Sequence, residues 1–147
     1  MAGSVIIRPL GEDEREAWNP LWAGYLAFYK SALAQEISDL AWSRFHDPDE
    51  PLFALGGYVD GRLSGIAHYL FHRSTWAYNR YCYLEDLFVA RTYRGSGAAR
   101  ALIEGVYAEA DRRGADSVYW HTQSYNAPAR SLYDQVAQPT SFVVYER

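Results

Sequence analysis

Residues 81–100 constrain the fold of this chain more than any other segment. They read YCYLEDLFVARTYRGSGAAR, an aromatic and aliphatic run of strand character that leads through a glycine turn into a helix. The helical pattern continues through Leu102, Val106 and Ala110, which recur at helical spacing. A glycine turn that opens a helix exposes unpaired N–H groups at the positive end of the helix dipole. The segment therefore predicts a strand, a turn and a helix, with an anion site at the turn.

The glycines of this turn do not match the nucleotide-binding loops. Arg100 stands where the third glycine of a Gly-x-Gly-x-x-Gly pattern would fall, and no Gly-Lys-Ser/Thr follows. These departures disfavour a mononucleotide-binding domain. At this point an ordinary strand–turn–helix connection remains an open alternative.

The remaining segments predict one α/β domain that spans residues 1–147. Strands are expected at residues 5–10, 52–59, 63–71, 81–89, 117–122 and 141–146, and helices at residues 11–29, 34–44, 98–113 and 126–136. Pro20 could interrupt the first helix, and Asp60-Gly61 predicts a two-residue hairpin. An antiparallel meander followed by strand–helix–strand crossovers predicts a mixed, mostly antiparallel sheet with helices on both faces.

Composition and charge exclude several classes of partner. The chain has 147 residues, a net charge of −4 and no block of basic residues, so binding to nucleic acid is not expected. Its mild acidity favours a cationic small substrate over an anionic one. The four histidines lack the spacing of a metal site.

The N-terminal segment and the single cysteine indicate the compartment. No signal-peptide pattern and no apolar stretch of membrane-spanning length occur in the sequence. Cys82 has no second cysteine with which to pair, and its place in a strand predicts a buried thiol. A cytoplasmic protein without a membrane partner is expected.

The flanks of the glycine turn carry a family resemblance. The string LEDLFV, then four residues, then Arg-Gly-x-Gly-x-Ala resembles the acetyl-CoA signature of the GNAT N-acetyltransferases. The resemblance implies that the turn wraps the pyrophosphate of coenzyme A and that the strand backbone pairs with pantetheine. The implied turn residues are Arg94, Gly95, Ser96, Gly97, Ala98 and Ala99, and the strand residues are Leu87, Phe88 and Val89. LEDLFV is especially similar to the spermidine/spermine and histone/polyamine acetyltransferases.

A second motif follows the fifth predicted strand. Asn126, Ala129 and Tyr133 resemble the Asn-x-x-Ala-x-x-x-Tyr element of the same family. The resemblance implies that Asn126 bonds the pantetheine arm and that Tyr133 protonates the departing thiolate. A hydroxyl donor in a dry pocket suits a thiolate leaving group. The alternative is that Tyr133 is a core aromatic residue of an amphipathic helix.

Adjacent carboxyl groups lie in the central strand. Neighbouring strand residues point to opposite faces, so Glu85 and Asp86 can face one cleft only if a bulge intervenes. The resemblance implies that Glu85 takes the ammonium proton of the acceptor, through water. Asp86 is either a second substrate carboxylate or the partner of an arginine. Two further side chains are candidates to touch the acceptor: Tyr29, from an aromatic helical stripe that is either core or pocket wall, and His121.

The expected function is transfer of an acetyl group from acetyl-CoA to a primary amine of a small molecule, by direct attack and without a metal. The alternatives are a non-catalytic acyl-CoA-binding module and an acetyltransferase for a protein amine. After Tyr133 the family commonly reads Lys-x-Gly-Phe, whereas this chain has Ala137 and Pro139. That departure resembles the histone/polyamine subgroup, whose end strand often contributes to a dimer, and a homodimer is expected.

Overall fold

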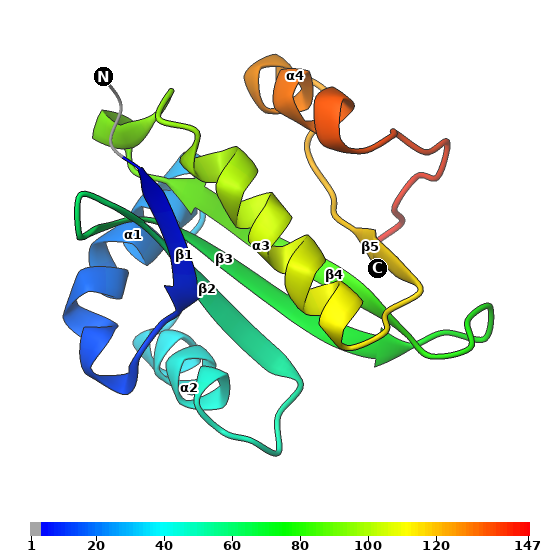
Figure 1. Cartoon of the computed structure of the whole chain (residues 1–147), viewed down its shortest axis with the longest axis horizontal. Coiled ribbons are helices and arrows are strands. Elements are labelled where there is room, and N and C mark those ends of the chain that lie inside the picture. The colour runs from blue at the N-terminus through cyan, green and yellow to red at the C-terminus, as the bar shows by residue number, and fades with distance from the viewer. Residues whose placement is uncertain (1–3) are drawn as a thin grey trace.

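The computed structural model of the protein describes residues 4–147, which form one five-stranded mixed sheet (Figure 1). The sheet order is β1 (Val5–Pro9), β2 (Leu52–Val59), β3 (Arg62–Arg73), β4 (Arg80–Val89) and β5 (Ser117–Tyr119). The helices are α1 (Arg15–Phe28), α2 (Gln35–Phe45), α3 (Ala98–Arg112) and α4 (Ala127–Val136), with 3-10 turns η1 (Glu12–Glu14) and η2 (Arg91–Tyr93). Only β4 and β5 pair in parallel. The predicted α/β fold with a mostly antiparallel sheet is confirmed.

Helices cover both faces of this sheet and give each face its own apolar core. α3 lies across one face of the sheet (Figure 1). Its residues Leu102, Ile103 and Val106 are fully buried there. α1 and α2 cover the other face with Trp18 and Trp42. Burial of side chains of this size stabilises the fold by roughly 1.5–3 kcal/mol each. The two cores hold β4 between α1 and α3, and β4 carries most of the predicted site.

Local turn chemistry follows the sequence closely. Asp60 and Gly61 have φ angles of 50° and 79°, as a two-residue hairpin of the primed type requires. Gly114, with φ 69°, ends α3 in the left-handed region. α1 continues through Pro20 without interruption, since Trp18 and Leu21 anchor it in the core on either side of the proline.

Strand predictions are wrong at the C-terminal end of the sheet. β5 stops at Tyr119 rather than residue 122, because β4 and β5 pair only as far as Tyr83 and Tyr119. Residues 141–146 form no strand: no strand of residues 4–147 lies beside them to accept their backbone hydrogen bonds. The first strand also ends one residue early, at Pro9.

Cys82 is buried in β4, as predicted. Burial raises the pKa of its thiol to about 12, so it is not a reactive thiolate at neutral pH. Within residues 4–147, no helix combines the length and the apolar character needed to span a bilayer.

Candidate active site

β4 contains one residue more than its partner strand at the centre of the sheet. His68 of β3 pairs with Asp86, and Tyr69 pairs with Leu84, which leaves Glu85 without a partner in the ladder. This bulge reverses the alternation of side chains along β4. Leu84 packs into the α3 core, whereas Asp86 lies beside His68 on the α1 face. The bulge that Glu85 and Asp86 would need in order to face one cleft is therefore present.

A cleft lies beside β4, beyond the point where β5 ends. Beyond Tyr83 and Tyr119 the strands separate, and residues 87–89 pair with β3 alone. Their backbone groups on the β5 side thus have no strand partner in the part of the chain that the structure describes. A cavity of about 320 Å³ lies here, between α1, β4 and α4. Its lining includes Tyr29, Leu87, Phe88, Val89, Asn126 and Tyr133.

The glycine turn forms the outer end of the same cleft. Gly95 and Gly97 have φ angles of 82° and 88°, and no atom lies within 4 Å of the position that a Cβ would take at either residue. α3 begins at the next residue, Ala98, so its first N–H groups face this opening. Ser96 Oγ accepts a hydrogen bond from the Ala98 N–H at 3.3 Å, which leaves the hydroxyl proton free to donate.

A second cavity, of about 270 Å³, lies against this turn. It shares the lining residues Val89, Arg94, Ala99 and Leu132 with the larger cavity, so the two form one groove. Arg94 is exposed beside the groove and supplies a positive charge next to the helix dipole. This geometry suits a long ligand with an anionic group at the turn and a thinner arm along β4.

At its inner end the groove adjoins a small cavity of about 20 Å³. Glu85, His121 and Tyr133 line it, together with Tyr25 and Tyr29. Tyr133 also lines the large cavity and thus stands between the arm of the ligand and the carboxylate. His121 is exposed, and its Nδ1 lies 3.2 Å from the hydroxyl of Tyr83. The structure thus brings together four of the predicted substrate and catalytic side chains, namely Tyr29, Glu85, His121 and Tyr133.

The surroundings of Glu85 and Tyr133 shift both groups toward their protonated forms. Glu85 remains accessible to solvent, but partial desolvation of its carboxyl, and then the charge of Asp86, raises its pKa above the usual range. Burial, with a smaller effect of Tyr29, raises the pKa of Tyr133 to about 12. A carboxylate of raised pKa is a stronger base, and a phenol of this pKa keeps its proton at neutral pH. The pair can therefore accept a proton at one side of the cavity and donate one at the other.

Asp86 has a histidine as its partner rather than the arginine that the sequence suggested. Its Oδ2 lies 2.9 Å from Nδ1 of His68, and Nε2 of His68 accepts a hydrogen bond of 3.0 Å from the indole of Trp18. Asp86 does not line the small cavity, but it lies close to Tyr25 and Tyr29. Burial is the main cause of the raised pKa of both hydroxyls, and the charge of Asp86 is the second.

The importance of His68 escaped the sequence analysis, which considered it only as a metal ligand. A signal was present: residues 64, 66 and 68 of a predicted strand share one face, so His68 continues a buried row. Its cross-strand neighbour depends on the bulge, which the sequence pattern does not reveal. Among residues 4–147, no three His, Cys, Asp or Glu side chains group as a metal site requires.

Comparisons with known proteins agree with this geometry. The sequence profile of the Acetyltransferase (GNAT) family matches residues 10–137. The D-amino-acid N-acetyltransferase HPA3 of Saccharomyces cerevisiae is 37% identical over 145 residues, which cover 97% of this chain and 90% of that protein. A streptothricin acetyltransferase of Escherichia coli is 34% identical over 87 residues, covering 59% of this chain and 47% of that protein.

Solved structures share the fold at low sequence identity. The aminoglycoside N-acetyltransferase AAC(6')-Iy, in complex with a bisubstrate analogue of coenzyme A, superimposes with a TM-score of 0.85 at 18% identity, covering 99% of this chain and 98% of that one. A ribosomal-protein-alanine N-acetyltransferase of Brucella melitensis gives 0.82 at 24% identity, covering 98% of this chain and 99% of that one. The family match covers most of the chain, including the whole groove. The chain belongs to the acetyltransferase (GNAT) family and is an N-acetyltransferase with acetyl-CoA as its cosubstrate.

Proposed function

We propose that this enzyme acetylates a primary amine of a small cationic molecule, with Glu85 as the base and Tyr133 as the acid. One observation carries the proposal: Glu85 and Tyr133 line the same small cavity at the inner end of the groove. Coenzyme A would lie along this groove, its pyrophosphate at residues 94–99 and its pantetheine arm beside Leu87, Phe88, Val89 and Asn126. The thioester then reaches Tyr133, where the two cavities meet.

The chemistry needs no covalent enzyme intermediate. Glu85 takes a proton from the acceptor ammonium, through water, and frees the lone pair of the nitrogen. This nitrogen forms a bond to the thioester carbonyl carbon, while backbone N–H groups of β4 stabilise the oxyanion. The C–S bond breaks, the hydroxyl of Tyr133 protonates the leaving thiolate, and the nitrogen gives up its second proton to water as the amide forms. Proton exchange with solvent then restores both side chains.

The charge of the site supports a cationic acceptor. Among residues 4–147, Glu85 is the only carboxyl group that lines the small cavity, and no lysine or arginine lines it. Asp86 adds a second negative charge behind Tyr25. Diamines, polyamines and amino-acid-like amines are the acceptor classes that we propose; the two relatives named for D-amino acids and streptothricin also point to small-molecule amines. A protein amine is the alternative acceptor.

A panel of acceptors tests this assignment. Release of coenzyme A would be measured with diamines, polyamines, D- and L-amino acids and short peptides as acceptors. We expect turnover with at least one small amine, and a large loss of kcat in Tyr133→Phe while binding of coenzyme A by calorimetry is retained. Binding of acetyl-CoA without turnover of any small amine would contradict the proposal, and turnover of peptides alone would support the protein-amine alternative.

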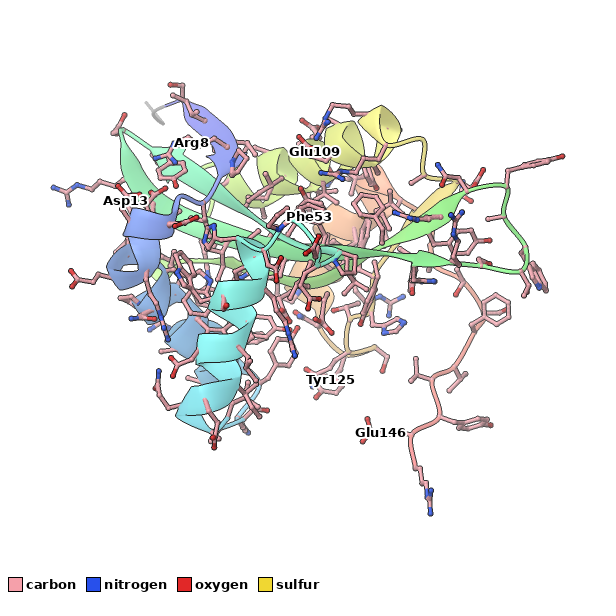
Figure 2. The ribbon with its side chains drawn as sticks, turned by 90° about the horizontal axis from the view of Figure 1, so that it is seen from below. Arg8, Asp13, Phe53, Glu109, Tyr125 and Glu146 are labelled. Carbon is pink, nitrogen blue, oxygen red and sulfur yellow. The ribbon has the colours of Figure 1, made fainter. Side chains whose placement is uncertain are left out.

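We also propose that two copies of the chain associate through their C-terminal tails. Phe142, Val144 and Tyr145 are 84%, 65% and 94% exposed, and the tail extends away from the rest of the chain up to Glu146 (Figure 2). β5 pairs with β4 on one edge, and no strand of residues 4–147 occupies its other edge. A groove of about 340 Å³ runs beside β5, between it and residues 137–140. An apolar segment of strand character and a free sheet edge on each copy are complementary.

Light scattering on the full chain tests this association. We expect a dimer, and dissociation to monomers in Val144→Asp, because burial of a charge opposes the addition of the tail to the edge of β5. Thr75→Asp, at an exposed position in the connection between β3 and β4 and outside this groove, is the control for added charge. A wild-type chain that is monomeric at micromolar concentration would refute the proposal.

A further inference from the structure

Trp18, His68 and Asp86 form a buried hydrogen-bonded chain behind the acceptor site. Trp18 of α1 is fully buried and His68 of β3 is 2% exposed. The indole N–H of Trp18 lies 3.0 Å from Nε2 of His68, and Nδ1 of the same ring lies 2.9 Å from Oδ2 of Asp86. The chain thus connects the helical core to the strand that carries Glu85.

The chemistry of the donors decides where the imidazole proton lies. An indole nitrogen can only donate, so Nε2 of His68 must accept and carries no proton. In the neutral ring the single proton is then on Nδ1, where it is donated to the carboxylate of Asp86. A second proton would have to enter on Nε2, where it would face the indole N–H at 3.0 Å. Trp18 therefore opposes the positively charged ring.

This arrangement affects the charge at the acceptor site. Of the five salt bridges within residues 4–147, the only one that involves Asp86 joins it to His68. With His68 neutral, the negative charge of Asp86 has no cationic partner in that set and acts on its neighbours. The effect on Glu85 is direct: the charge of Asp86 raises the pKa of Glu85, whereas a positively charged His68 would lower it.

We propose that Trp18 and His68 are positioning residues for acetyl transfer: the indole holds the imidazole as the neutral Nδ1–H tautomer, and this tautomer holds Asp86 as an oriented, unneutralised anion beside Glu85 and Tyr25. The inference rests on the proposed role of Glu85 as the base. Neither Trp18 nor His68 is among the residues that line the groove or the small cavity. Their contribution is that the carboxylate behind the cavity keeps its direction and its full charge.

The tautomer of His68 tests this role. If Trp18 only filled space in the core, its loss would not change which nitrogen of His68 carries the proton. Without the indole donor, the proton of His68 can shift to Nε2, and the bare Nδ1 then faces the carboxylate of Asp86, acceptor against acceptor. The carboxylate would turn away. Loss of one charge-assisted hydrogen bond at this place is expected to lower kcat/KM for the acceptor about tenfold, with the KM for acetyl-CoA unchanged.

The experiment compares Trp18→Phe with Trp42→Phe. Trp42 is 8% exposed, packs on Trp18 with ring centroids 5.1 Å apart, and donates no side-chain hydrogen bond within residues 4–147, so it controls for loss of an indole from the same core. Nitrogen-15 NMR of the imidazole at pH 7.5 is expected to show the Nδ1–H tautomer in the wild type and in Trp42→Phe. A shift toward Nε2–H or the charged ring is expected in Trp18→Phe alone, together with the tenfold loss.

A second pair of variants at His68 provides the rescue. The amide of glutamine holds both a donor and an acceptor, so His68→Gln is expected to retain several-fold more activity than His68→Leu. An Nε2–H or charged ring in the wild type, or a Trp18→Phe variant identical to Trp42→Phe in tautomer and kcat/KM, would overturn the proposal. The NMR readout does not need turnover, so this failure is distinguishable from failure of the proposed reaction.

Discussion

Tyr83 and Tyr119 are the last residues that pair between β4 and β5, and their rings stack with centroids 4.9 Å apart. They stand at the point where the sheet divides, and the hydroxyl of Tyr119 also bonds Nε2 of His72 at 2.7 Å. The stack therefore marks the end of the pairing between β4 and β5.

Substitutions at Tyr119 should separate the stack from the hydroxyl. Tyr119→Phe keeps the stacked ring and loses one hydrogen bond, which should lower the free energy of unfolding by about 0.5–1.5 kcal/mol. Tyr119→Ala loses the aromatic pair as well, which should cost about a further 0.5–1.5 kcal/mol beyond the lost buried area. Urea denaturation measures both, and equal stability of the two variants would show that the stack contributes nothing.

Glycine at position 97 should be required both for its backbone and for ligand approach. Gly97→Ala places a side chain on a backbone with φ 88°, a strain of roughly 1–2 kcal/mol, and puts a Cβ in the opening that faces the anion. Binding of coenzyme A, measured by calorimetry, should weaken at least tenfold.

Gly61→Ala is the matched control for that experiment. Gly61 has φ 79° and an equally open surrounding, but it lies in the β2–β3 hairpin outside the groove. It should cost similar stability and leave coenzyme binding unchanged. Equal loss of binding in both variants would mean that strain, and not the Cβ at the turn, weakens the site.

The rate should depend on pH through Glu85 on the acid side only. The pKa of Glu85 is raised and that of Tyr133 is about 12, so kcat/KM should rise with pH through ionisation of the carboxyl and of the acceptor amine. No fall caused by Tyr133 is expected below pH 10. A basic limb near pH 8 that disappears in Tyr133→Phe would contradict this assignment.

The raised pKa of Glu85 also affects the stability of the fold. A salt-bridged carboxylate stabilises the folded state at neutral pH, whereas ionised Glu85 destabilises it. Because folding raises the pKa of Glu85, the unfolded chain loses this proton first, and the ionised group destabilises the folded state at neutral pH. Glu85→Gln should therefore be more stable than the wild type at pH 7.5, with the difference gone at pH 4. Thermal unfolding at the two pH values tests this, and a less stable variant at pH 7.5 would refute it.

Glu14 should behave in the reverse manner. Its carboxylate accepts hydrogen bonds from Arg8, from the Gly11 N–H at 2.9 Å and from the Tyr58 hydroxyl at 2.7 Å. Chiefly the bond from Arg8 lowers its pKa to about 2. Glu14→Gln should therefore be less stable than the wild type at pH 7, and the difference should shrink as the pH falls from about 5 toward 2. A difference that does not change with pH would show that charge is not involved.

Local patterns in the sequence predicted much of the fold, and the residues that they suggested for the site line one groove and the small cavity beside it. The glycine turn, the Asp60-Gly61 hairpin and the helix of residues 98–112 depend on neighbours in the chain, and each formed as expected. Other features depend on contacts between distant segments. The partner of Asp86 comes from another strand through an irregular register, and residues 141–146 have strand character but pair with no strand of residues 4–147.

The bulge at Glu85 has a further consequence. If that one residue were removed, the pairs Tyr69–Leu84 and His68–Asp86 would follow each other without a break, and the strand would become regular. The residue proposed as the base is thus the inserted residue itself. Its side chain reaches the cleft because Glu85 is the extra residue of β4, which pairs with no residue of β3. Deletion of Glu85 should therefore make the pairing of β3 and β4 regular and, at the same time, abolish acetyl transfer. The variant with the regular strand would be the inactive one.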